Sequence, residues 1–183
     1  PALLKSQDPA GNTPLHLAAA RGDAALVELF LAKKADVQAR NGVAQTPLHR
    51  AVVATNAAVV KLLLDARSDV NAKDAQGSVP LHGAVRKQNV ENIKLLLASQ
   101  ANVNATDTFG RSCFFVAATG GNHEVVKLLL ESKAEPQCRD QNGITPLHLL
   151  AGGGHLEALK LLLAGQTDVN VRDQAGNTPL HFA

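Results

Sequence analysis

A single pattern that returns every 33 residues constrains this chain more than any other feature of its sequence. Thr-Pro-Leu-His, or a variant of it, begins without insertions at six positions: Thr13, Thr46, Val79, Ser112, Thr145 and Thr178. Asp or Asn lies five residues before each start, and Leu lies sixteen residues after each of the first five. A fixed period of this length is typical of tandem arrays in which each unit packs only on its neighbours. The sequence therefore predicts one such array.

The register of the pattern sets the boundaries of the units. We place repeats at 8–40, 41–73, 74–106, 107–139 and 140–172, with the tail of an earlier repeat at 1–7 and a partial repeat at 173–183. Leu4 fills the slot that Val37 and Val70 hold later, and Ala183 falls inside an expected helix. We therefore interpret the chain as a slice of a longer protein whose two ends expose apolar faces.

Each unit contains signals for two helices. Thr46 is a natural N-cap and Pro47 a natural first helical residue, which predicts a first helix that runs to about Ala54. After a polar break, a second helix is expected over roughly 57–66. Its three consecutive leucines, 62–64, cover a wider arc than a surface helix can leave exposed, so neighbours must cover it on both sides. The polar segment that follows, which ends in Asp and Gly, indicates a tight turn.

At this level of detail the chain resembles the ankyrin repeat family, which shares the Thr-Pro-Leu-His start, the period and the Asp-Val-Asn-Ala link. The resemblance covers nearly every residue from Asp8 onward. It implies an all-α fold, an ankyrin-repeat solenoid of stacked helix-turn-helix units with β-hairpin-like fingers. The family's usual glycine after the second helix is absent, so those caps are either strained or built differently. The matching residues are Lys34, Arg67, Gln100, Lys133 and Gln166.

The histidines and cysteines suggest packing roles and no chemistry. Five histidines are the fourth residue of the motif: His16, His49, His82, His148 and His181. Stacked helices place them about 10 Å apart, too far to share a zinc ion, so we expect hydrogen bonds across the stack. Phe115 replaces this histidine in the fourth repeat and should pack by apolar contact. Cys113 and Cys138 are expected to be reduced packing thiols, which favours an intracellular location, cytoplasmic or nuclear.

No motif in the chain predicts catalysis. No glycine-rich loop follows a strand, and no nucleophile motif is present, so we expect no enzyme activity, no cofactor, no metal and no small-molecule substrate. The run Gly152-Gly153-Gly154 falls at a helix end without the Lys-Ser/Thr of a phosphate loop, and we interpret it as a weak point of the fifth repeat. No apolar run is long enough to span a membrane.

The resemblance implies that partners bind to the finger tips and the exposed side of the first helices. Equivalent positions of successive repeats form columns along these surfaces. The columns predict twelve partner-binding residues: Arg21, Arg40, Val43, Val53, Lys73, Arg86, Lys87, Phe109, Arg111, Arg139, Ile144 and Arg172. Eight of the chain's eighteen basic residues lie in these columns, which hold no acidic residue. The basic residues directly before the motif aspartates could instead neutralise them, and Phe109 could fold back on its own finger; the sequence leaves both alternatives open.

The function expected from this pattern is a non-catalytic scaffold for protein–protein interaction, which grips an acidic partner segment that carries an apolar anchor. One alternative is binding to an anionic polymer or membrane surface. Nucleic acid is disfavoured because single strands need several stacking aromatic residues, and the face offers Phe109 alone. Another alternative is that the array is the regulatory or targeting portion of a larger enzyme or channel.

Overall fold

The computed structural model describes residues 2–54, 56–165 and 167–183, and it is helical. The chain divides into two compact units, Pro1–Asn102 and Val103–Ala183, which we describe one at a time. The described residues form no named strand, and a single isolated β-bridge joins Thr106 and Ser112. The all-α prediction is therefore confirmed.

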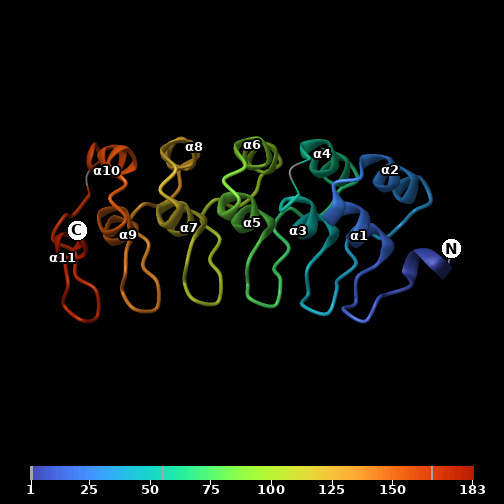
Figure 1. Ribbon diagram of the computed structural model, residues 1–183, viewed down its shortest axis with the longest axis horizontal. Helices are drawn as coiled ribbons and strands as arrows, with labels where there is room; N and C mark the ends of the chain where they lie inside the picture. The colour runs from blue at the N-terminus through green and yellow to red at the C-terminus, as the bar shows by residue number, and fades with distance from the viewer. Residues whose placement is uncertain (1, 55, 166) are drawn as a thin grey trace. The chain divides into compact units, whose positions relative to one another are not determined.

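The first unit consists of a short 3-10 helix followed by three pairs of helices (Figure 1). These elements are η1 (Ala2–Lys5), α1 (Pro14–Arg21), α2 (Ala24–Ala32), α3 (Pro47–Ala51), α4 (Ala57–Asp65), α5 (Pro80–Arg86) and α6 (Val90–Ala98). First helices pack on first helices, α1 on α3 and α3 on α5, whereas the second helices α2, α4 and α6 form a parallel row. A long finger precedes each first helix.

The second unit repeats the same plan. Its elements are α7 (Cys113–Gly120), α8 (His123–Glu131), α9 (Pro146–Gly152), α10 (Leu156–Leu163) and α11 (Pro179–Phe182). Here α7, α9 and α11 form the row of first helices, and α8 packs on α10 (Figure 1). The buried residues follow the repeat: the motif leucines Leu48 and Leu81 in the first unit are fully buried, and their counterpart in the second unit, Leu147, is buried as well.

The starts of the first helices are fixed by the motif itself. In α1, the Thr13 amide and hydroxyl both lie within hydrogen-bond distance of His16 Nδ1, at 3.1 and 2.8 Å, and Pro14 occupies the first turn. The second helices start at Asp or Asn caps, as where Asn56 Oδ1 accepts from the Ala58 amide at 3.0 Å. The α10 helix differs, because His155 stands at its N-cap and makes no side-chain cap bond.

The helix ends differ from the prediction in one place. The first helix of the second repeat ends at Ala51, three residues before the expected Ala54, and continues as turns through Val52 and Val53. Consecutive β-branched residues favour helix less than the alanines that extend α1, which agrees with the early end. The second helix ends at Asp65, within a residue of its expected end.

The second helices end in strained caps. Four residues that lack the family's glycine have positive φ: Lys34, Arg67, Gln100 and Lys133, with φ from 59 to 66°. Gln166, the fifth, lies outside the described residues. A non-glycine residue costs about 1 kcal/mol in this conformation. An amide side chain of the preceding repeat binds the carbonyl of three of these residues: Gln38 for Arg67, Asn71 for Gln100 and Asn104 for Lys133.

The glycine run of the fifth repeat is better accommodated than the sequence suggested. Gly154 has a φ of 63°, where glycine is favoured over any other residue. A Cβ on Gly153 would collide with the ring of His155, and so would a Cβ on Gly121 in the repeat before. Gly152 lies against Phe182. At each of these positions, the backbone conformation or the neighbouring atoms therefore favour glycine over a larger residue. The interpretation of the run as a weak point stays a prediction.

Candidate partner-binding face

The motif histidines are structural in both units. His16 Nε2 donates to the Gln45 carbonyl at 2.8 Å, His49 Nε2 to Ser78 at 3.0 Å, and His148 Nε2 to Asn177 at 3.1 Å. Because a carbonyl oxygen accepts only, the ring proton sits on Nε2 and Nδ1 is free to cap the helix. Burial lowers the pKa of His16 and His49, which keeps both rings neutral. The expected bonds across the stack are confirmed for these three residues.

The fourth repeat replaces this arrangement by apolar contact. Phe115 is buried, with 6% of its surface exposed, and Ser112 Oγ caps its amide at 3.2 Å. Cys138 Sγ lies 3.0 Å from Ser112 Oγ, and Cys113 is fully buried. Both thiols are free, and burial raises the pKa of each. They are therefore packing residues with little thiolate character.

The fingers hold the predicted arginines in fixed positions. Arg40 Nη1 donates to the carbonyl of Lys73 on the next finger at 2.6 Å, and Arg139 Nη1 to that of Arg172 at 2.9 Å. Arg172 Nη1 donates within its own finger to Gly176 at 2.6 Å. The carbonyl acceptors are neutral, so these guanidinium groups keep their charge while bridging neighbouring fingers. All three side chains remain exposed.

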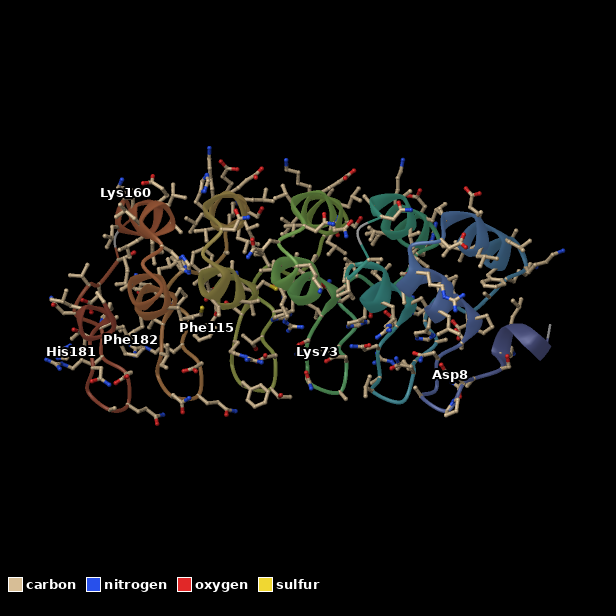
Figure 2. The ribbon with its side chains drawn as sticks, viewed as in Figure 1. Asp8, Lys73, Phe115, Lys160, His181 and Phe182 are labelled. Atoms are coloured by element: carbon tan, nitrogen blue, oxygen red, sulfur yellow. The ribbon has the colours of Figure 1, made fainter. Side chains whose placement is uncertain are left out.

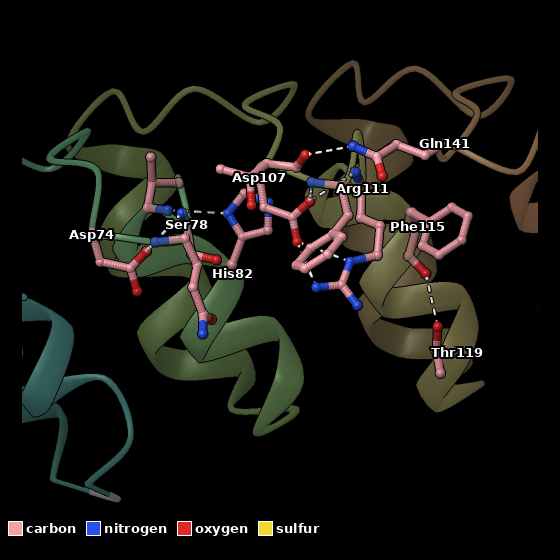
Figure 3. Close-up of polar contacts among 12 residues, drawn as sticks. Asp74, Ser78, His82, Asp107, Arg111, Phe115, Thr119 and Gln141 are labelled. Carbon is pink, nitrogen blue, oxygen red and sulfur yellow. Dashed lines mark hydrogen bonds and ion pairs between the residues drawn. The ribbon is translucent and has the colours of Figure 1, made fainter. Parts of the chain in front are cut away.

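Arg111 is the exception among the predicted cations. Its guanidinium lies 2.7 Å from Asp107 Oδ2, and its Nε donates to the same oxygen at 2.9 Å (Figure 3). Burial works to raise the pKa of Asp107, but hydrogen bonds from Arg111 and from the finger amides hold it below its usual value. The guanidinium also lies over the Phe109 ring, 4.7 Å from its centroid. Asp107 thus balances the charge of Arg111, which lies four residues after the motif aspartate. Arg40 and Arg139, which lie directly before the equivalent slots, Asn41 and Asp140, bind carbonyl groups instead.

Phe109 is presented at the tip of a rigid finger. Its side chain is 49% exposed, and the ring contacts Arg111 of its own finger. The Gln141 amide donates to the Phe109 carbonyl at 3.1 Å, and Gln141 Nε2 donates to Thr108 at 2.8 Å (Figure 3). These bonds fix the tip to the next finger. Val43, which occupies the same slot two repeats earlier, is 53% exposed.

In the first unit, four of the predicted cations are exposed and unpaired. The side chains of Arg21, Lys73, Arg86 and Lys87 are exposed, and none has a hydrogen bond or ion pair with any described residue. Val53, on the same face, is 43% exposed. In the second unit, Ile144 is only half-buried at the base of its finger. The structure thus exposes ten of the twelve predicted residues and half-buries Arg111 and Ile144.

One basic residue that the sequence analysis missed belongs to this face. Arg50 follows the motif histidine in α3, and the corresponding residue of α5 is Gly83. Arg50 and Arg86 line a cavity of about 180 Å³ between α3, α5 and the adjacent fingers. Arg50 is half-buried and has no polar partner among the described residues. The signal was present, because the residue after the four-residue motif has five identities among the six repeats: Leu17, Arg50, Gly83, Val116, Leu149 and Phe182.

In the second unit, the side formed by the second helices is an ordinary solvated surface. Lys160 of α10 points away from the fingers and pairs with Glu157 at 2.8 Å (Figure 2). Lys127 lies 3.9 Å from Glu131. Here cations and carboxylates alternate, whereas the predicted columns of the finger side contain no carboxylate.

A larger and more apolar cavity lies at the carboxyl end of the second unit. It measures about 440 Å³ and is lined by residues of α9, α10 and α11, among them Leu156, Leu163 and Leu180. Leu180 is 83% exposed, which confirms that this end presents an apolar face. In the preceding repeat, the equivalent surface of α7 and α8 is covered by α9 and α10.

The described residues lack two features. They contain no group of three or more His, Cys, Asp or Glu side chains arranged to hold a metal ion. Within the same part of the chain, no helix combines the length and the apolarity needed to cross a membrane.

Comparison with known proteins identifies the repeat. A family model described as ankyrin repeats (3 copies) matches residues 2–74 and 114–183, and a second, described as ankyrin repeats (many copies), matches 84–130. A similar solved structure is the ankyrin repeat domain of Bcl-3, described as a unique member of the IkappaB protein family. It is 29% identical over 98% of this chain and 81% of that chain, with a TM-score of 0.87. No match was found among curated proteins.

Proposed function

Because the chain belongs to the ankyrin repeat family, we propose that its finger and first-helix side binds an acidic, partly apolar segment of another protein. Ankyrin repeats are interaction scaffolds, and the fold is in general not catalytic. The proposal adds to this the face that binds and the chemistry of the partner.

The observation that supports the proposal is a group of unpaired cations in columns that hold no carboxylate. In the first unit, Arg86 and Lys87 at the end of α5 have no partner among the described residues, and Lys73 at the finger base has none either. An unpaired cation retains its full field, so a stretch of carboxylates would meet several of them at once. On the second helices, by contrast, carboxylates share the helix with the cations: Lys160 is paired with Glu157 on α10, and Lys61 and Lys94, unpaired among the described residues, have Asp65 and Glu91 on their own helices.

The second unit contributes a different kind of contact. Phe109 and the guanidinium of Arg111 form a stacked, charge-balanced platform on a finger held by Gln141. An exposed aromatic ring that is already immobilised loses little conformational entropy on binding. Such residues are the usual sites of large affinity losses when truncated. We therefore assign Phe109 the role of apolar anchor.

The proposal is tested by selection from a library of random displayed dodecapeptides, with the whole chain as bait. We expect the recovered peptides to be enriched in Asp and Glu and to carry one large apolar residue. Amide chemical shifts, recorded while the tightest peptide is added, should then change at the fingers and first helices. The same peptide with Gln and Asn in place of its acidic residues is the control and should bind at least tenfold more weakly.

Two results would overturn the proposal. One is recovery of peptides without acidic enrichment. The other is a set of shift changes as large on α4 and α6 as on α3 and α5, which would favour diffuse attraction to anionic surfaces.

A further inference from the structure

The cavity between α3 and α5 exists because one repeat lacks a side chain. The residue after the motif histidine is Leu17 in α1, Arg50 in α3 and Leu149 in α9, but it is Gly83 in α5. A Cβ at Gly83 would lie 3.0 Å from Val52 Cγ2, so the glycine lets Val52 pack beneath it. The space that a longer side chain would fill remains open as the cavity of about 180 Å³.

The size of this cavity suits one side chain. Sites for small molecules usually measure about 300–1,000 Å³, well above this volume. Its apolar lining comes from Val52, Val53, Val79 and Pro80, with Val53 the exposed member at the rim. A chain that passes over the face could therefore place a single residue here, with its methylene groups against these side chains.

The charges that line the cavity favour an anion. Arg50 and Arg86 contribute two cations, and neither has a partner among the described residues. Asp74 contributes one carboxylate, whose Oδ1 accepts from the amides of Gln76 and Ser78, each at 2.9 Å (Figure 3). His49, the remaining ionisable group of the lining, is neutral because burial lowers its pKa. The lining therefore carries one net positive charge.

We infer that this cavity, called here the Gly83 pocket, receives one acidic side chain of the partner segment, with its carboxylate between Arg50 and Arg86. The inference rests on the proposed function and specifies where one carboxylate of the partner is recognised. A single carboxylate makes the lining neutral. Two arginines can each donate to its oxygens, and charge-assisted hydrogen bonds of this kind are the stronger ones.

The test uses a probe that contains only the side chain in question. N-acetyl-glutamate α-amide is added to the isotopically labelled chain at millimolar concentration, and its neutral isostere, N-acetyl-glutamine α-amide, is the control. We expect saturable shifts of the Val53, Ser78 and Gly83 amides with the glutamate probe and none with the glutamine probe.

Two variants separate filling of the pocket from damage to packing. Gly83→Leu and Gly83→Ala share the new contact with Val52, but only leucine fills the space, so Gly83→Leu should bind the probe at least tenfold more weakly than Gly83→Ala. Arg50→Gln leaves Gly83 and its packing on Val52 unchanged, and it should also weaken binding of the glutamate probe at least tenfold. Melting curves of all three variants confirm that each is folded.

The inference is overturned if the glutamate probe gives no saturable shifts, or if Gly83→Leu binds it as well as Gly83→Ala. It is also overturned if inorganic phosphate binds the pocket more tightly than the carboxylate probe. None of these results affects the selection of acidic peptides by the whole face, so the pocket can fail while the proposed function stands.

Discussion

The contact between the second and third repeats and the contact between the fourth and fifth repeats use the same positions in opposite ways. In the first, His49 caps its own helix and donates to Ser78 of the next repeat. In the second, Phe115 fills the equivalent space with a ring that can do neither. The stack therefore tolerates either a hydrogen-bonded or an apolar connection at this position, provided that the buried groups around it have partners.

The candidate binding faces of the same repeats also differ, one being polar and the other more apolar. Around α3 and α5 the cations Arg50 and Arg86 are unpaired, and they flank a pocket. On the fourth repeat, Asp107 neutralises Arg111, and the exposed group is Phe109. We infer that the first region acts on a partner through charge, whereas the second offers apolar contact.

The largest expected effect concerns the two stacking connections. His49→Phe copies the fourth repeat into the second but leaves the buried Thr46 amide and hydroxyl without the histidine, whereas the Ser78 carbonyl keeps its bond from the Asp74 amide. We expect it to lower the free energy of unfolding by about 2–4 kcal/mol, because each buried group that loses its partner costs about 1–3 kcal/mol. Urea denaturation followed by circular dichroism measures the loss.

The reciprocal substitution is the matched control. Phe115→His gives a ring that the Ser112 amide and the Ile144 carbonyl can both bind, so its cost should stay within about 1 kcal/mol. An equal loss of unfolding free energy in the two variants would contradict the claim that the surroundings of His49 depend on its hydrogen bonds and those of Phe115 do not.

A smaller effect is expected at the finger tips. Phe109→Ala should raise the dissociation rate of the selected acidic peptide about 5- to 30-fold, which corresponds to about 1–2 kcal/mol of lost apolar contact. Val43→Ala is the matched variant, because Val43 holds the same slot and is similarly exposed. It removes less apolar surface and should change the rate less. Surface plasmon resonance gives both dissociation rates. An equal increase in the two variants would contradict the proposal that Phe109 is the apolar anchor.

Much of the fold could be predicted from the sequence, because the repeat fixes the register at several independent positions. The helix starts, the structural histidines and the buried Phe115 all follow from the motif, since capping and burial are local consequences of residue type. The early end of α3 at Ala51 did not follow, because helix ends depend on a balance of small propensities.

The candidate site was predictable as a set of columns but not as a set of pairings. Register identified Arg40 and Arg111 alike, yet one guanidinium binds carbonyl groups and the other binds a carboxylate. That difference depends on side-chain reach between fingers, which the spacing of residues does not encode. The Gly83 pocket was missed for a related reason. Its space comes from the missing side chain of Gly83 in the third repeat, but its walls include side chains of the second repeat, and the spacing of residues does not show how the two meet.

The most direct test of the account is the association rate of the selected acidic peptide, measured at several salt concentrations. The variant Arg86→Glu/Lys87→Glu reverses two unpaired cations at the end of α5. Lys61→Glu/Lys94→Glu makes the same change in net charge on α4 and α6. We expect the first variant to slow association about tenfold at low salt, with the difference shrinking as salt screens the field, and the second to change it little. Equal slowing by the two variants would contradict the claim that the finger and first-helix side is the binding face.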